Sequence, residues 1–198
     1  IFPAHLGFKF KSYNGLPDAN LLEKAYGESK SRILLTAENI DPLPTDETYS
    51  NESAHSKIFR YKLDSNLASG EGDLYNYQDY AAMVYDNLYP KTDKKTETLV
   101  TSFISNIPLA SDPTEQIRNI EYKIKSTISY NKYFEENSNF TDAITSRQAN
   151  DLDMLRLYLA VFKRFNIENQ IVMTSKRYQV LFDKDFETLE QIGDILLY

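Results

Sequence analysis

The most informative stretch of this sequence is ANDLDMLRLYLAVFKRFNIENQIVMT, residues 149–174. Its first part, from about Asp151 to Phe165, carries apolar side chains at the spacing of one helical face. These side chains are Met154, Leu155, Tyr158, Val161, Phe162 and Phe165. The residues from Gln170 to Thr174 are predicted to form a strand. The stretch therefore predicts a helix followed, after a short turn, by a strand.

Three further helices are predicted upstream, because apolar residues recur there every three or four positions. Their apolar faces are Tyr77, Tyr80, Ala81, Val84, Tyr85 and Leu88; Leu99, Val100, Phe103, Ile104 and Ile107; and Ile117, Ile120, Ile124 and Ile128. The third helix follows Asp112-Pro113, a capping residue and an early proline that suit a helix start. Residues Asn131 to Gln148 are predicted to be a polar loop.

The residues before Gly72 favour strands instead, because apolar and polar side chains alternate there in short runs. One run holds Leu6, Phe8 and Phe10, and another covers Arg32 to Ala37. A third run covers Ile58 to Leu63, with Phe59, Tyr61 and Leu63 on one face and Arg60 and Lys62 on the other, as is typical of a half-buried antiparallel strand. The fold class expected is α+β, an antiparallel β domain followed by a helical part.

Composition excludes several classes of function. The chain of 198 residues has a net charge of −7, which argues against a general nucleic-acid binder. It has no cysteine, and hence no thiol nucleophile, disulfide or thiolate ligand. We expect no membrane-spanning segment, since no apolar run is long enough. No cofactor or metal site is predicted, and Asp183-Lys184-Asp185 is interpreted as an exposed turn.

The stretch around Asp151 resembles the core of the transglutaminase-like (papain-like) superfamily. In that family a catalytic cysteine begins the helix, an acidic residue follows two positions later, and a basic residue and a Gly-Ile pair end the helix. Here Asp151 stands at the position of the cysteine and Asp153 at the acidic position, while Arg164 and Asn166-Ile167 match the end. The family's downstream histidine has no counterpart, because the only histidines are His5 and His55.

Two upstream strings, residues 10–15 and 36–42, resemble a domain of unknown function that precedes such cores in Gram-negative cell-envelope proteins. This resemblance implies that residues 1–72 are the carboxyl-terminal part of that β-rich domain. Residues 73–198 would be the transglutaminase-like core, incomplete at its carboxyl-terminal end. The implied location is the periplasm or the cell surface, and residues 1–10 show no signal-peptide pattern.

The resemblance implies a non-catalytic binding or scaffolding module that recognises a peptide, a glycan or a protein of the cell envelope. Its groove would lie at Asn150, Asp151 and Asp153, where Asn150 or Asp151 caps the helix and the acids compensate its dipole. A joint hydrolytic or metal-binding role for the two acids is disfavoured, because residues two apart on a helix diverge. The alternative is a fragment of an active cysteine peptidase or transglutaminase whose catalytic residues are misaligned or lie outside the chain.

The tyrosines at 75, 77, 80, 85 and 89 form a stripe that could stack on sugar rings or anchor a partner. Packing in a core or between domains is the favoured interpretation.

Overall fold

The computed structural model describes residues 1–22, 29–42, 55–89, 92–134, 140–176 and 180–198. The protein is α+β, as predicted. It divides into two compact units, each described by itself. We call the first the strand unit, residues 1–82 and 173–196, and the second the helical unit, residues 83–172 and 197–198. The domain boundary expected after residue 72 stays a prediction.

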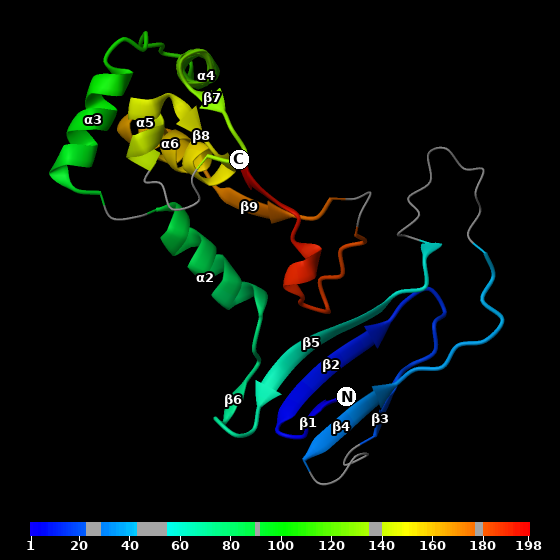
Figure 1. Ribbon diagram of the computed structural model, residues 1–198. Coiled ribbons are helices and arrows are strands. Elements are labelled where there is room, and N and C mark those ends of the chain that lie inside the picture. Colours follow the sequence, from blue (N-terminus) through cyan, green and yellow to red (C-terminus); the bar gives the residue numbers. More distant parts are fainter. Residues whose placement is uncertain (23–28, 43–54, 90–91, 135–139, 177–179) are drawn as a thin grey trace. The chain divides into compact units, whose positions relative to one another are not determined.

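The strand unit contains two antiparallel sheets of three strands, β1-β4-β3 and β2-β5-β6 (Figure 1). The strands are β1 (Phe2–Pro3), β2 (Leu6–Ser12), β3 (Asn20–Leu22), β4 (Lys30–Leu34), β5 (Phe59–Asn66) and β6 (Glu71–Gly72). The first and third predicted strands are confirmed as β2 and β5. The second begins and ends earlier than expected, because its pairing with β3 ends at Leu34 opposite Asn20.

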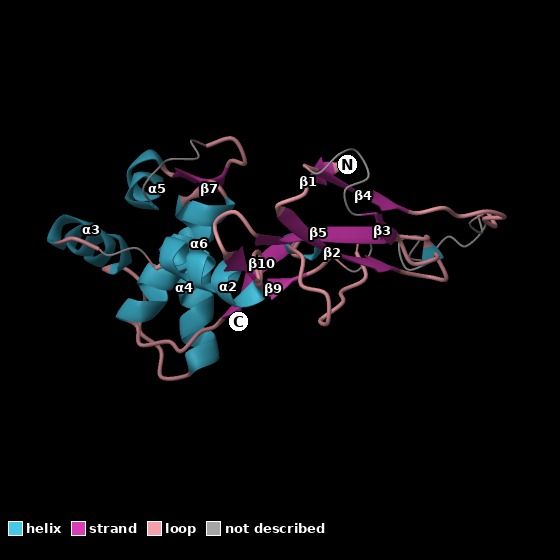
Figure 2. Ribbon diagram, turned by 90° about the horizontal axis from the view of Figure 1, so that it is seen from below, coloured by secondary structure: helices cyan, strands magenta, loops and turns pink. Residues whose placement is uncertain are grey.

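Strands β2 and β5 lie side by side over their whole length (Figure 2). Their register places Lys9 opposite Lys62 and Lys11 opposite Arg60, so that one face of the pair is basic. The polar residues of β5 are its buried ones: Arg60 is 5% exposed and Lys62 9%, whereas Tyr61 is 61% exposed. The alternation was predicted correctly, but burial favours the opposite face from the one that apolarity suggests. The carboxyl-terminal segment described below contacts Lys11 and Arg60 on this face.

The helical unit contains the hydrophobic core. Its elements are the end of α2 (Tyr77–Leu88), α3 (Lys94–Ile104), α4 (Pro113–Thr127), β7 (Ser129–Tyr130), α5 (Phe140–Ser146), β8 (Gln148–Ala149) and α6 (Asp151–Arg164). Val100, Ile120, Ile124, Leu157 and Val161 are among the buried side chains at its centre. Helix α4 begins as predicted, with Asp112 as its cap and Pro113 in its first turn.

Two predictions for this unit are wrong. The segment expected to be a polar loop contains α5 and β8, because Phe140 and Ala143 are buried in the core and α5 packs against α3 and α6. Ile117 was expected to face inward, but it is 38% exposed, and the inward face of α4 is made by Gln116, Ile120 and Ile124.

Helix α6 has the predicted bounds, and Asn166 and Ile167 lie where it ends. Asn166 has a φ of 52°, a left-handed conformation that asparagine adopts more readily than most residues. The amide of Ile167 donates to the carbonyl of Phe162 at 3.0 Å, and the amide of Asn166 donates to that of Lys163 at 3.4 Å. These bonds form a Schellman motif, which satisfies carbonyls that the helix end leaves free.

The chain ends with β9 (Ile171–Thr174), the short helix η1 (Leu189–Gln191) and β10 (Asp194–Leu197), and β9 and β10 pair with each other. Strand β9 confirms the strand predicted at Gln170 to Thr174. In the part of the chain that the structure describes, no helix has the length and apolar composition to cross a membrane.

Candidate functional site

The start of α6 is built around Asn150, which is the residue that caps the helix. Its backbone is extended, with φ −82° and ψ −178°, and its side-chain oxygen accepts a hydrogen bond of 2.9 Å from the amide of Asp153. Its side-chain nitrogen donates to the carbonyl of Phe134 at 3.2 Å. Asn150 therefore satisfies one of the free amides of the first turn and ties the preceding loop to the helix.

Asp153 points into the protein and is only 1% exposed. One of its carboxylate oxygens lies 3.3 Å from Nη1 of Arg156, one turn later on the same helix. Arg156 also donates to the main-chain carbonyl of Asn87 at 2.9 Å and to the side-chain oxygen of that residue. A buried carboxylate needs such a partner, since leaving a charge unpaired in the interior is costly. Asp153 therefore joins the start of α6 to the end of α2.

Asp151 lies on the other side of the first turn and is exposed. The hydroxyl of Tyr130 donates to its carboxylate at 3.2 Å. Tyr130 is brought there by the parallel pairing of β7 and β8, which sets it beside Ala149. Desolvation, and then the bond to the ionised Asp151, raise the pKa of Tyr130 above its ordinary value.

The two acids thus point apart, one buried and one in solvent. Among the described residues, no three histidine, cysteine or acidic side chains gather closely enough to hold a metal ion. The helical unit contains no histidine, because His5 and His55 both belong to the strand unit. A nucleophile and a base within hydrogen-bonding reach are the requirement for covalent catalysis, and this helix start supplies neither a thiol nor an imidazole.

A hollow of about 450 Å³ lies beside this helix start, and we call it the α6 hollow. It is lined by Lys125, Ile128, Ser129, Tyr130, Met154 and Tyr158. Burial raises the pKa of Tyr158, whose ring meets the ring of Phe162 edge-on at a centroid distance of 5.9 Å. The α6 hollow therefore combines aromatic and thioether surface with hydroxyl groups and one lysine.

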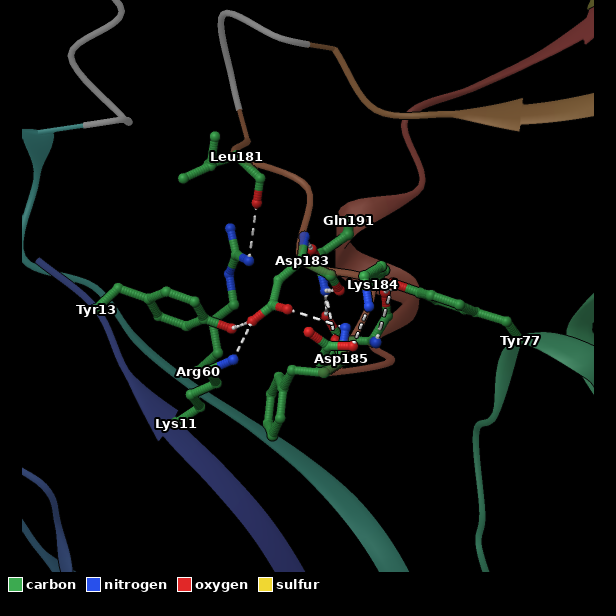
Figure 3. A network of polar contacts seen from close by, with 11 residues as sticks. Lys11, Tyr13, Arg60, Tyr77, Leu181, Asp183, Lys184, Asp185 and Gln191 are labelled. Carbon is green, nitrogen blue, oxygen red and sulfur yellow. Dashed lines mark hydrogen bonds and ion pairs between the residues drawn. The ribbon is translucent and has the colours of Figure 1, made fainter.

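A second polar cluster, in the strand unit, was missed by sequence reasoning (Figure 3). The carboxylate of Asp183 accepts bonds from Nζ of Lys11 at 2.6 Å and from the hydroxyl of Tyr13 at 2.7 Å. Nη1 of Arg60 donates to the carbonyl of Leu181 at 3.1 Å. The interpretation as an exposed turn is therefore wrong for Asp183, whose side chain is 14% exposed, although it describes Lys184 and Asp185.

The cluster shifts the pKa values of its members in opposite directions. Burial alone would raise the pKa of Asp183, but the bonds from Lys11 and Tyr13 outweigh it and lower that pKa to about 2. Burial, followed by the bond to the ionised Asp183, raises the pKa of Tyr13 to about 12. Both shifts mean that the folded protein favours an ionised carboxylate on Asp183 and a neutral phenol on Tyr13.

The role of this cluster is to neutralise the basic face of β2 and β5. Like charges directly opposite each other on two strands repel. Asp183 forms an ion pair with Lys11 at 2.6 Å, and Asp64 lies 2.7 Å from Lys9 and 3.9 Å from Lys62. The alternation of Lys9 and Lys11 with apolar residues was the available signal, because it predicts a basic face that needs acids from elsewhere in the chain.

The segment that carries Asp183 is held in shape by Gln191, a fully buried side chain. Its amide nitrogen donates to the carbonyl of Phe186 at 2.6 Å, and its oxygen accepts from the amide of Asp183 at 2.6 Å. The ring of Tyr77 stacks on Phe182 at 6.0 Å. We interpret this cluster as structural, since its members bind one another: Asp183 binds Lys11 and Tyr13, and Arg60 binds the carbonyl of Leu181.

The tyrosine stripe is only partly packed. Tyr75 is 54% exposed and Tyr85 58%, while the buried residues of α2 are Val84 and Leu88. The hydroxyl of Tyr89 donates to the side chain of Asn169 at 3.0 Å. Tyr75 and Tyr85 are therefore not core residues, although the ring of Tyr85 lies 4.5 Å from the ring of Tyr89, and packing between domains stays a prediction.

Comparison with known proteins gives one informative similarity. A solved structure of a proposed protease from Parabacteroides distasonis matches with a TM-score of 0.58 and 11% sequence identity. The match covers 98% of this chain but 36% of that one, so the chain spans about a third of its structural relative. No protein-family model and no curated protein matches the sequence. At this identity the similarity shows the fold alone, and the chain shares the fold of part of a proposed protease.

Proposed function

We propose that this chain is a non-catalytic, transglutaminase-like module that binds a peptide segment of a partner protein in the α6 hollow. The observation that carries the proposal is the state of the first turn of α6. Its two acids have structural partners, Arg156 for Asp153 and Tyr130 for Asp151. No thiol exists anywhere in the chain.

The chemistry of that turn supports binding without turnover. An N-terminal helix turn stabilises negative charge, which in a cysteine enzyme favours the thiolate. A carboxylate at the same position also interacts favourably with the helix dipole, but it is a far weaker nucleophile toward a peptide bond than a thiolate is. Asp151 therefore keeps the electrostatic arrangement of such a turn while removing its reactivity.

Peptides are the ligand class that we favour over glycans. The hollow offers two tyrosine rings and the flexible thioether of Met154, which adapt to apolar side chains. The chain shares its fold with part of a proposed protease, and proteases are a class of protein that binds extended peptides. This second argument is an analogy of fold and adds weight only to the first.

The wider setting is part of the same proposal and rests on the sequence resemblance. In it, residues 1–72 belong to a β-rich domain of unknown function and residues 73–198 to the transglutaminase-like core. The parent protein is located in the periplasm or at the cell surface, where a peptide, a glycan or an envelope protein is available as partner.

A second candidate function is a piece of an active peptidase or transglutaminase whose catalytic residues lie elsewhere in a longer protein. The similarity to a proposed protease, of which this chain covers 36%, favours that alternative. The two functions differ in what happens to a bound peptide, which the first leaves intact.

Binding can be tested with an array of peptides and a set of cell-wall oligosaccharides, followed by nuclear magnetic resonance titration of the labelled chain. We expect a peptide to shift resonances of residues that line the α6 hollow. Replacing Tyr130, which is 57% exposed, by alanine should weaken that binding about tenfold, as for an aromatic contact at the centre of an interface. Tyr122→Ala, at a 77% exposed position on α4, is the matched control and should leave it unchanged.

If oligosaccharides shift these resonances and peptides do not, the ligand is a glycan and the proposed site is still correct. Absence of any ligand at the hollow, or equal losses for Tyr130→Ala and Tyr122→Ala, would contradict the proposal.

A further inference from the structure

A second cavity of the helical unit lies on a different part of α6 and shares no lining residue with the α6 hollow. This cavity, which we call the α3–α6 pit, has a volume of about 220 Å³. Its apolar lining comes from Leu88, Val100, Phe140 and Leu159, each no more than 3% exposed. Four elements, α2, α3, α5 and α6, each contribute one of these side chains. The pit is therefore a built feature of the core rather than a surface irregularity.

The rim of the pit is charged, and its charges do not balance. Arg156 is neutralised by Asp153 at 3.3 Å, and Arg164 lies 3.7 Å from Glu97. Lys163 remains as an exposed cation that also lines the pit. Within the described part of the chain, no carboxylate forms an ion pair with Lys163. One unbalanced positive charge thus stands beside an apolar cavity.

Lys163 has a modest structural role as well, because a cation in the last turn of a helix interacts favourably with the helix dipole. That role requires only a basic residue near the helix end, and Arg164 in the same turn already supplies one. It does not account for an apolar cavity beside the cation.

We propose that the α3–α6 pit binds a small apolar group that ends in a carboxylate, with the apolar part against Tyr89 and Ala160 and the carboxylate against Lys163. A single negative charge matches the single unbalanced positive one. The volume is below the ~300 Å³ at which sites for whole small molecules begin, so the occupant is a fragment about the size of one amino-acid residue. The last residue of a peptide chain has this size and chemistry, and a short fatty acid shares both.

This inference does not depend on the function proposed for the α6 hollow. A peptide terminus in the pit and a peptide segment in the hollow would be separate binding events, since the two cavities have no residue in common. Each can be abolished by a substitution that leaves the other cavity intact.

The test is a magnetic resonance titration of the whole labelled chain at neutral pH with N-acetyl-leucine, its uncharged amide and hexanoate. We expect the acid to bind and the amide to bind at least about fivefold more weakly, because a charge-assisted bond is lost. The affinity of the Lys163→Gln variant for N-acetyl-leucine should fall to its affinity for the uncharged amide. Lys95→Gln, on α3 but outside the lining, is the matched control and should behave as the original chain does.

A second variant tests the cavity itself. Ala160 lines the pit and is only partly buried, so Ala160→Leu should fill the pit without removing a core side chain. We expect it to abolish binding of both N-acetyl-leucine and its uncharged amide. The magnetic resonance spectrum of the protein backbone should stay that of a folded protein. Hexanoate binding as well as N-acetyl-leucine would support an acyl chain as the natural source, and a preference for N-acetyl-leucine would support a peptide terminus.

Three outcomes would overturn the inference. The first is no binding of either acid at millimolar concentration. The second is equal binding of acid and amide. The third is an equal loss in Lys163→Gln and Lys95→Gln, which would show a general effect of net charge.

Discussion

Asp153 and Arg156 form an ion pair of 3.3 Å within the first turns of α6, and the carboxylate is almost completely shielded from solvent. The acid two residues earlier, Asp151, is exposed on the other side of the helix. Two acids that are neighbours in the sequence therefore have different physical roles. Asp153 belongs to the packing of the helical unit, and Asp151 belongs to its surface.

The different roles predict different costs of substitution. Asp153→Ala should lower the free energy of unfolding by about 3 kcal/mol, because it leaves the guanidinium of Arg156 without its buried partner. Asp151→Ala should change it by less than about 1 kcal/mol, since the bond from Tyr130 is exposed. Urea denaturation of both variants measures the difference. Equal costs would show that Asp153 is not held as the structure describes.

The capping role of Asn150 gives a second prediction. Asn150→Ala should cost about 1 kcal/mol of stability, as loss of a capping side chain does, whereas Asn150→Asp and Asn150→Ser keep an acceptor and should cost much less. Urea denaturation of the three variants provides the comparison. A similar loss in all three would mean that the bond to the carbonyl of Phe134, and not the cap, is what matters.

Acid should weaken the strand unit through Asp183. Its pKa is lowered from 3.8 to about 2, so the folded protein favours the ionised carboxylate. The resulting stabilisation is complete above about pH 4 and disappears as the pH falls toward 2. Asp183→Asn should be less stable by about 2 kcal/mol at neutral pH, as for a lost bond to a charged group, and should lack this acid-dependent loss.

Thermal unfolding at a series of pH values measures this effect, with the exposed Asp185→Asn as control. A pH dependence between 4 and 2 that is the same in Asp183→Asn and the original chain would rule out Asp183 as its source.

Alkali should act on the other member of the pair. Because the pKa of Tyr13 is raised from 10.0 to about 12, its neutral form is favoured in the folded protein. Its contribution is complete below about pH 10 and is lost as the pH rises toward 12. The difference in stability between the original chain and Tyr13→Phe should therefore shrink over this range. A constant difference would mean that Tyr13 titrates normally.

Several features of the fold could be predicted because their signals are local. The bounds of α6 follow from its periodicity and from Asn150 at its start, and the start of α4 follows from Asp112 and Pro113. The Asn166 that ends α6 fits a position where the backbone must be left-handed. Each of these signals lies within a few residues of the structure that it determines.

Other features depend on distant parts of the chain. Helix α5 lies in a segment of polar character, and it forms because Phe140 and Ala143 reach the core between α3 and α6. Asp183 is 170 residues from Tyr13, so no local pattern could identify the pair. Of the candidate site, sequence reasoning placed Asn150, Asp151 and Asp153 at a helix start. It could not foresee that one acid would be buried, because the depth of a first turn is set by what packs around it.

We propose that the start of α6 supports binding without bond cleavage. The most direct test is mass spectrometry of a peptide that binds the α6 hollow, incubated with the chain and with its Asp151→Cys variant. The original chain should leave the peptide intact at saturation. The variant thiol should be alkylated at a lower pH than a free cysteine, because it lies at a helix start, and should still leave the peptide intact, since the helical unit has no histidine. Cleavage by the original chain at a rate that Asp151→Ala reduces would contradict the account.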